Sequence, residues 1–301
     1  MKTTHGPGFH FSPSHVILVY YFQGPGADTV EQNKQRIVVK VGTSTLTHDS
    51  GAVDLRSMEH LVRVLSDLSG AGHEVILVTS GAIAVGTARL GLPERPKELR
   101  MKQAAAAVGQ CRMMHIYDKL FSEYNRTMAQ ILLTGDDVED PQRAEHLRST
   151  FSALLEMGVI PVVNENDSVS SAEIETGHHK VLGDNDTLSA IVAELCRADL
   201  LVLLSDIDGL YNADPKRYPG ARLLHQVQEL TPEILEMAGG AGSWRGTGGM
   251  ATKLSAARIA MNAGCDMVIT NGERMENLYG IVEGKDIGTR FLAAGYEEGR
   301  V

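Results

Sequence analysis

Cysteine is scarce in this sequence, and paired metal-ligand motifs are lacking. The chain has 3 cysteines, Cys111, Cys196 and Cys265, which are widely separated and show no CxxC spacing. This argues against a disulfide framework and against a zinc site. The histidines form no metal-binding pattern either, because adjacent His178 and His179 have no obvious third ligand nearby. We therefore expect the cysteines to be small buried residues in a reducing compartment, and the protein to be cytoplasmic.

Basic charge and long apolar runs are also scarce. The chain has 28 Lys and Arg against 38 Asp and Glu, which gives a formal net charge of -10. Nucleic acids and anionic membrane surfaces require clustered basic residues, so we expect no nucleic-acid partner and no membrane partner. The apolar patch at residues 16–22 is shorter than the roughly 20 residues that span a bilayer. A small soluble substrate fits this composition better.

The first 34 residues differ in composition from the rest, with Gly, Pro, His and Ser around that one apolar patch. We interpret residues 1–34 as an N-terminal extension that is disordered or an artificial addition. Residues 35–295 are predicted to form one continuous domain with no internal repeat, and residues 296–301 a tail. A chain of this length is long enough to bury a sizeable core.

From Arg36 onward, short apolar runs alternate with longer helical stretches. This pattern is typical of βαβ units and predicts an α/β fold with a mostly parallel sheet. The runs are apolar throughout, as in strands covered on both faces, at residues 37–41, 75–79, 128–133, 159–163, 200–204 and 267–270. Apolar residues at helical spacing predict helices at residues 55–68, 103–123, 143–157, 187–196 and 250–263.

Ligands of such sheets bind beyond the carboxyl ends of the strands. The first predicted strand ends in KVGTS, where Lys40 offers a point charge for phosphate and Gly42 allows close approach of a ligand to the backbone. A lysine that extends from an ordinary strand end explains this motif equally well. The second strand leads into TSGAIAVG at residues 79–86, whose small residues leave amide groups free for an anion at a helix N-terminus.

Acidic and amide side chains follow the next buried strands. NENDS at residues 164–168 and GDND at residues 183–186 could hold an ammonium group, order a lysine or bind Mg²⁺ through water. The alternative is an Asx-rich turn followed by a helix N-cap. SDIDGLYNADP at residues 205–215 is either a simple connection or part of an adenine and ribose site.

The strongest local signal is GTGGMATK at residues 246–253, at the start of a predicted helix. Its glycines expose backbone amides, and Lys253 lies one turn into the helix, which favours binding of a phosphate chain. The order of residues differs from the Walker pattern. A flexible glycine-rich loop is the alternative.

Taken together, eight ordered segments resemble those of the glutamate 5-kinases in the amino acid kinase family. They are KVGTS, VTSGAIA, AAVGQ, ILLT, PVVNENDSV, GDNDTLSA, LLSDIDGLYNADP and GTGGMATK, and the resemblance covers about residues 36–292. It implies the amino acid kinase fold, a three-layer αβα sandwich with a mostly parallel central sheet. The amino-acid site would lie in the N-terminal half and the nucleotide site in the C-terminal half.

The resemblance also implies roles for individual residues. Lys40 and Lys253 would lie on either side of the transferred phosphoryl group, with Asp186 ordering both lysines as the third catalytic residue. The glutamate site would contain Ser80, Gly81, Asp167 and Asn185. The ATP site would contain Lys40, Gly42, Ser205, Asp206, Thr247, Gly248, Gly249, Met250, Ala251, Thr252 and Lys253. No residue is assigned to a metal ion.

The implied activity is ATP-dependent phosphorylation of the L-glutamate side-chain carboxylate, the first step of proline biosynthesis, with Mg²⁺ bridging the ATP phosphates. That carboxylate has a pKa of about 4.3 and needs no catalytic base at neutral pH. The resemblance further implies feedback inhibition by proline and a functional link to glutamyl phosphate reductase, and we expect a homo-oligomer, either a dimer or a tetramer. Many family members carry a C-terminal PUA domain, and we expect this chain to lack one.

Other functions fit the same motifs. A kinase of the same fold could act on acetylglutamate, aspartate or UMP. A non-catalytic amino-acid sensor is a further alternative, although the two lysines and the glycine-rich loop argue against it.

Overall fold

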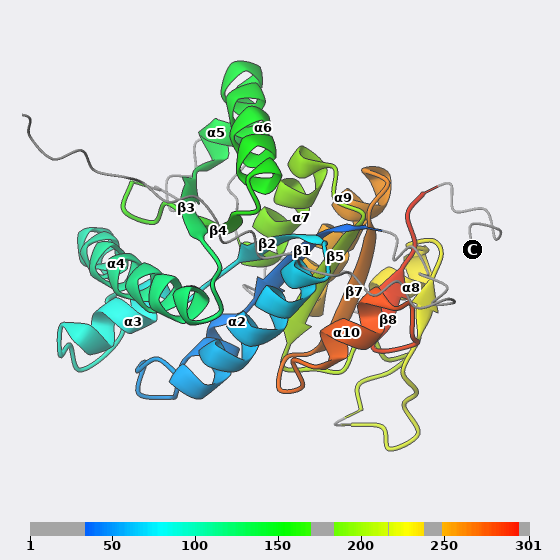
Figure 1. Cartoon of the computed structure of the whole chain (residues 1–301). Helices are drawn as coiled ribbons and strands as arrows, with labels where there is room; N and C mark the ends of the chain where they lie inside the picture. The colour runs from blue at the N-terminus through cyan, green and yellow to red at the C-terminus, as the bar shows by residue number, and fades with distance from the viewer. Residues whose placement is uncertain (1–33, 170–183, 216, 238–248, 295–301) are drawn as a thin grey trace, which may run out of the picture. The chain divides into compact units, whose positions relative to one another are not determined.

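A mostly parallel sheet forms the centre of the computed structural model, which describes residues 34–169, 184–215, 217–237 and 249–294. In this part of the chain the sheet has the strand order β3-β4-β2-β1-β5-β7-β8-β6 (Figure 1). Neighbouring strands are parallel except for the antiparallel pair β7 and β8. The strands are β1 Arg36–Val41, β2 Glu74–Val78, β3 Met128–Leu133, β4 Ile160–Glu165, β5 Leu200–Ser205, β6 Gln226–Val227, β7 Asp266–Asn271 and β8 Thr289–Phe291.

Helices cover both faces of the sheet, which gives the three αβα layers predicted from the sequence (Figure 1). One face is covered by α2 Leu55–Gly70, α3 Ala82–Arg89, α4 Leu99–Glu123 and α10 Asn277–Val282. The other is covered by α6 Pro141–Glu156, α7 Asn185–Cys196 and α9 Met250–Asn262. The remaining helices of the described residues are short: α1 Thr43–Leu46, α5 Gly135–Glu139 and α8 Pro232–Met237.

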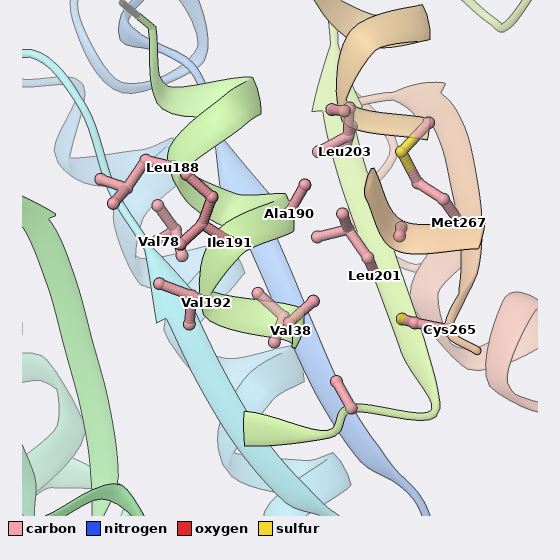
Figure 2. Close-up of a cluster of buried hydrophobic side chains, with 14 of the residues drawn as sticks. Val38, Val78, Leu188, Ala190, Ile191, Val192, Leu201, Leu203, Cys265 and Met267 are labelled. Carbon is pink, nitrogen blue, oxygen red and sulfur yellow. The ribbon is translucent and has the colours of Figure 1, made fainter. Parts of the chain in front are cut away.

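Alternate residues of each central strand enter the two cores. Val38 of β1 belongs to the same buried cluster as Leu188 and Val192 of α7 (Figure 2), whereas Val39 belongs to the cluster on the α2 side. All four side chains are fully buried. Because successive side chains of a strand point to opposite faces, a strand buried on both faces must be apolar throughout. This is the reason that the apolar runs identify the strands.

The six predicted strands are all present, and their ends differ from the prediction by no more than two residues. The five predicted helices are also confirmed, although α4 begins at Leu99 rather than Gln103 because its first turn is largely exposed and shows no apolar stripe. The apolar pattern does not predict β6, β8, α1, α5, α8 or α10, which are too short to show a period. No helix of the described residues is long and apolar enough to cross a membrane.

The crossing of α3 and α4 depends on two glycines. A Cβ atom at Gly86 would lie 1.8 Å from the Ala105 carbonyl oxygen, and one at Gly109 would lie 1.8 Å from the Ala82 carbonyl oxygen. The two backbones are therefore in direct contact. This contact fixes the first turn of α3, which follows the carboxyl end of β2.

Contacts group residues from Lys34 to Val301 in one unit. Of the predicted extension at residues 1–34, only Lys34 belongs to the described residues, and the tail at residues 296–301 lies outside them. The assignment of an amino-acid half and a nucleotide half stays a prediction.

Candidate active site

The carboxyl ends of β1, β2, β4 and β5 border a cleft of about 510 Å³, together with the first turns of α7 and α9. Ten of the predicted site residues line this cleft: Lys40, Gly42, Ser80, Gly81, Asp167, Asn185, Asp186, Ser205, Asp206 and Lys253. The structure thus brings together residues that are more than 200 positions apart in the sequence. This is the location expected for a ligand site in an open α/β sheet.

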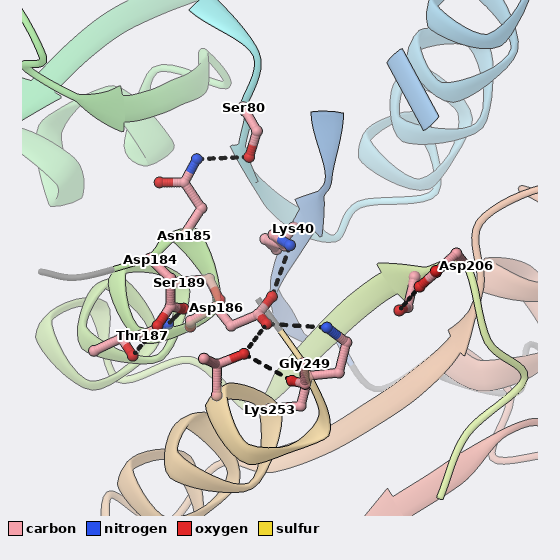
Figure 3. A network of polar contacts seen from close by, with 12 residues as sticks. Lys40, Ser80, Asp184, Asn185, Asp186, Thr187, Ser189, Asp206, Gly249 and Lys253 are labelled. Atoms are coloured by element: carbon pink, nitrogen blue, oxygen red, sulfur yellow. Dashed lines mark hydrogen bonds and ion pairs between the residues drawn. The ribbon is translucent and has the colours of Figure 1, made fainter. Parts of the chain in front are cut away.

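Two lysines meet one carboxylate at the centre of the cleft (Figure 3). Lys40 Nζ lies 2.6 Å from Asp186 Oδ1, and Lys253 Nζ lies 3.1 Å from Asp186 Oδ2. The lysines come from β1 and from the first turn of α9, and Asp186 from the first turn of α7. All three residues are buried, with Asp186 only 3% exposed.

The charge state of this group follows from its contacts. Burial alone would raise the pKa of Asp186, but the neighbouring Lys40 and Lys253 outweigh burial and hold that pKa below its ordinary value. Asp186 is therefore ionised at neutral pH. One negative and two positive charges leave a net positive centre that suits a phosphoryl group.

Thr252 ties the start of α9 to the same carboxylate. Its hydroxyl lies 2.9 Å from Asp186 Oδ2 and 2.8 Å from the Gly249 carbonyl oxygen. Gly249 is the N-cap of α9 and provides no side-chain cap, so amide groups of the first turn, which contains Met250 and Ala251, are available to an anion. Thr247 and Gly248, which were also predicted to hold ATP phosphates, lie outside the described residues.

Asn185 organises the other end of the cleft. Its Nδ2 lies 2.6 Å from Ser80 Oγ, 3.0 Å from the Thr79 carbonyl oxygen and 3.4 Å from Asn164 Oδ1. Asn164 in turn donates to Gln110 Oε1 at 2.8 Å. Both residues lie in motifs recognised in the sequence, AAVGQ and NENDS, yet the motifs alone gave no sign that they touch.

Glycine is required where β2 turns into α3. Gly81 has φ +98°, a left-handed conformation that residues with a side chain rarely adopt. A Cβ atom there would also lie 3.3 Å from Thr43 Cγ2. Next to it, the Thr79 hydroxyl and the Tyr117 hydroxyl are 2.8 Å apart in the core. The sequence does not predict a role for Tyr117, because no motif links this residue of α4 to the turn.

Acidic groups gather near Asn185. Burial and, to a lesser extent, the nearby Glu165 carboxylate raise the pKa of Asp167 to about 6, against the charge of Arg95, which lowers it. Arg95 lies in the loop between α3 and α4 and lines the cleft. The sequence does not predict Arg95 as a site residue, because its loop carries no motif that relates it to Asp167.

Ser205 and Asp206, which are predicted to bind ATP, lie at the carboxyl end of β5. Ser205 Oγ donates to Asp206 Oδ1 at 3.1 Å, and both residues line the cleft. Further along this loop, Asp208 accepts hydrogen bonds from the Tyr211 hydroxyl at 3.1 Å and from Asn271 Nδ2 at 3.0 Å. These bonds fix the loop against the end of β7.

The GDND segment contains both a helix N-cap and a carboxylate that orders the lysines, the two roles considered for it from the sequence. Asp184 is the N-cap of α7, and its side chain accepts from the Thr187 amide at 2.8 Å. Asp186, two residues later, orders the lysines instead. No group of three or more His, Cys, Asp or Glu side chains among the described residues could hold a metal ion.

Comparison with known proteins places this geometry in context. The family model described as the amino acid kinase family matches residues 35–271. A glutamate 5-kinase of Clostridium perfringens (strain 13 / Type A) is 54% identical over 262 residues, which cover 87% of this chain and 97% of that protein. A glutamate 5-kinase of Carboxydothermus hydrogenoformans is 55% identical over 261 residues, which cover 86% of this chain and 68% of that protein.

Solved structures show the same fold at low sequence identity. A UMP kinase from Bacillus anthracis superposes with a TM-score of 0.59 at 15% identity and covers 86% of this chain and 96% of its own. A carbamate kinase from Giardia lamblia, bound to AMP-PNP, has a TM-score of 0.59 at 15% identity and covers 87% of this chain and 99% of its own. These likenesses support the fold.

Proposed function

The chain belongs to the amino acid kinase family, and on this basis we propose that it transfers the γ-phosphoryl group of ATP to the side-chain carboxylate of L-glutamate. Identity of 54% over 262 residues to a curated glutamate 5-kinase supports glutamate as the acceptor. The product is glutamyl 5-phosphate, an acyl phosphate, and the reaction is the first step of proline biosynthesis.

The observation that carries this proposal is the pair of buried lysines on Asp186. In phosphoryl transfer from ATP to a carboxylate, an anion must approach a polyanion, so charge stabilisation is the main requirement. Lys40 of β1 and Lys253 of α9 reach the same carboxylate, and Asp186 holds both side chains in place. We assign both lysines to the transferred phosphoryl group and Asp186 to their orientation.

The acceptor is placed by the residues around Asn185. Ser80, Gly81 and Asn185 form the neutral wall of this end of the cleft, and Asp167 with Glu165 provides negative charge for the substrate ammonium group. The side-chain carboxylate of glutamate then points toward the two lysines. It is already ionised, so the mechanism needs no general base.

ATP is assigned to the remaining side of the cleft. Gly42, Ser205 and Asp206 line this side, and the first turn of α9, from Gly249 to Lys253, offers amide groups to the phosphates. Mg²⁺ bound to the ATP phosphates would supply further charge neutralisation. The Asp186 oxygens are already engaged by lysines and Thr252, so we do not assign Asp186 as a metal ligand.

Proline inhibition and a functional link to glutamyl phosphate reductase stay predictions from the resemblance, and a homo-oligomeric state and a cytoplasmic location stay predictions from the sequence. No specific contact among the described residues favours the sensor alternative over catalysis. Binding of an amino acid alone would not require two lysines and a phosphate-binding helix N-terminus in one cleft. The two lysines and the first turn of α9 therefore favour catalysis.

An acceptor comparison tests the proposal. ADP release would be measured in a coupled assay with L-glutamate, L-aspartate, N-acetylglutamate and UMP at equal concentrations. The proposal predicts the highest kcat/KM for L-glutamate. A higher kcat/KM for any of the other three acceptors would contradict the proposal and would show that the chain is a kinase for that acceptor.

A further inference from the structure

Three basic residues line the cleft in the described structure, and one of them has no role in the proposed function. Lys40 and Lys253 are both ion-paired with Asp186 at the phosphoryl-transfer centre. Arg95 instead reaches the cleft from the loop between α3 and α4, at the end that contains Glu165 and Asp167. The positive charge of Arg95 lowers the pKa of Asp167, against the effects of burial and of Glu165. The acceptor end of the cleft therefore contains two acids and one cation.

This arrangement matches the charges of the acceptor. L-Glutamate carries one ammonium group and two carboxylates. The side-chain carboxylate must lie at Lys40 and Lys253 to react, and the ammonium group finds its counter-charge at the acids. The α-carboxylate then remains, close to the ammonium group and among like charges unless a cation faces it. Arg95 is the basic side chain that the described structure provides at that end.

The chemistry of Arg95 suits this task. A guanidinium group binds a carboxylate through two parallel hydrogen bonds, which fixes the orientation of the carboxylate as well as its position. Arg95 also precedes Pro96, and a residue before proline is largely restricted to extended conformations. This restricts the backbone from which the Arg95 side chain extends.

We propose that Arg95 binds the α-carboxylate of the acceptor amino acid and so selects acceptors that carry two carboxylates. This inference rests on the proposed function and deepens it. It assigns substrate specificity to a loop outside the segments that carry the family resemblance.

The test compares two acceptors in two proteins. L-Glutamic acid α-amide keeps the side-chain carboxylate and the ammonium group of glutamate but carries a neutral amide in place of the α-carboxylate. The wild type is expected to prefer L-glutamate over this amide by about ten- to a hundredfold in kcat/KM, the range for one charge-assisted interaction. In Arg95→Ala the preference should fall to near unity, mainly through a higher KM for L-glutamate, with the KM for ATP unchanged.

Two further variants serve as controls. Arg95→Lys keeps the charge but loses the paired hydrogen bonds, so it should restore part of the preference. Arg100→Ala removes an arginine that is 80% exposed in the first turn of α4 and does not line the cleft, and it should behave as the wild type.

The outcomes separate this inference from the proposed function. If the wild type phosphorylates L-glutamate and Arg95→Ala keeps the full preference over the amide, the role of Arg95 is wrong and the proposed function stands. Equal kcat/KM values of the wild type for L-glutamate and its α-amide would also overturn the role of Arg95. If the wild type does not phosphorylate L-glutamate at all, the proposed function fails, and the inference fails with it.

Discussion

The ammonium group of Lys40, at the carboxyl end of β1, lies 2.6 Å from the carboxylate of Asp186 in the first turn of α7. The second oxygen of the same carboxylate binds Lys253 at 3.1 Å. Asp186 is thus the link between a strand and two helices, and it holds two like charges close together in a buried place. The stability of the cleft and the proposed chemistry depend on the same carboxylate.

Replacing Asp186 with Asn should destabilise the protein. The variant leaves two buried lysines without their counter-charge, and breaking a buried pair from one side costs about 3 kcal/mol or more. Urea unfolding measures this loss, and Asp49→Asn, a change at an exposed acid, is the matched control that should cost little. An Asp186→Asn variant as stable as the wild type would contradict the role of this carboxylate.

The effect of Asp186 should depend on pH. Its pKa is lowered in the folded protein, so its contribution is fully present above the unfolded value of about 3.9 and is lost as the pH falls through the folded value. The difference in unfolding free energy between the wild type and Asp186→Asn should therefore be constant at neutral pH and shrink in strong acid. A difference that grows on acidification would have the wrong sign.

Replacing Lys253 with Ala should reduce turnover more than substrate affinity. The loss of one charge at the transferred phosphoryl group is expected to lower kcat by about a hundredfold or more, with little change in the KM for L-glutamate. Steady-state kinetics measures both values. Lys285→Ala, which removes an exposed lysine outside the cleft, should leave both unchanged. Near-normal turnover in Lys253→Ala would show that Lys253 does not stabilise the transferred phosphoryl group.

The raised pKa of Asp167 predicts an acid limb in the activity profile. Asp167 is half protonated at a pH of about 6, and its protonated form loses the charge that pairs with the substrate ammonium group. The value of kcat/KM for L-glutamate should fall about tenfold per pH unit below that point. In Asp167→Asn the value should be low throughout and should lack this limb. The same limb in the variant would assign the titration to another group.

The contact between α3 and α4 makes a prediction on stability. Replacing Gly86 with Ala forces a methyl group against the Ala105 carbonyl oxygen, where 1.8 Å is available, and should cost about 3 kcal/mol. Gly220→Ala is the control, because a Cβ atom there has nothing within 4 Å and its backbone has no positive φ. Thermal unfolding of the two variants compares them. A Gly86→Ala protein as stable as Gly220→Ala would show that the helices can separate without cost.

The sequence predicted the parts of the fold that depend on local patterns. Residues of β1 such as Val38 and Val39 are both buried, on opposite faces, so the run is apolar and easy to recognise. The Gly86 and Gly109 contact could not be predicted in this way. Nothing in the spacing of two glycines 23 positions apart shows that their helices cross there.

The same limit applies to the site. Lys40, Asp186 and Lys253 each lie next to a strand end or helix start that the sequence marks, so the topology alone brings them to one edge of the sheet. Arg95 and Tyr117 come from a loop and from the middle of a helix. Their positions depend on how α3 and α4 pack, which only the three-dimensional structure gives.

Direct detection of the product tests the central claim most sharply. The purified protein would be incubated with ATP, Mg²⁺ and L-glutamate in the presence of hydroxylamine, which converts an acyl phosphate to a stable hydroxamate. We predict glutamate γ-hydroxamate in equal amount to the ADP released, and about a hundredfold less or lower still in the Lys253→Ala variant over the same time. ADP release by the wild type without any hydroxamate would contradict phosphorylation of the glutamate side chain.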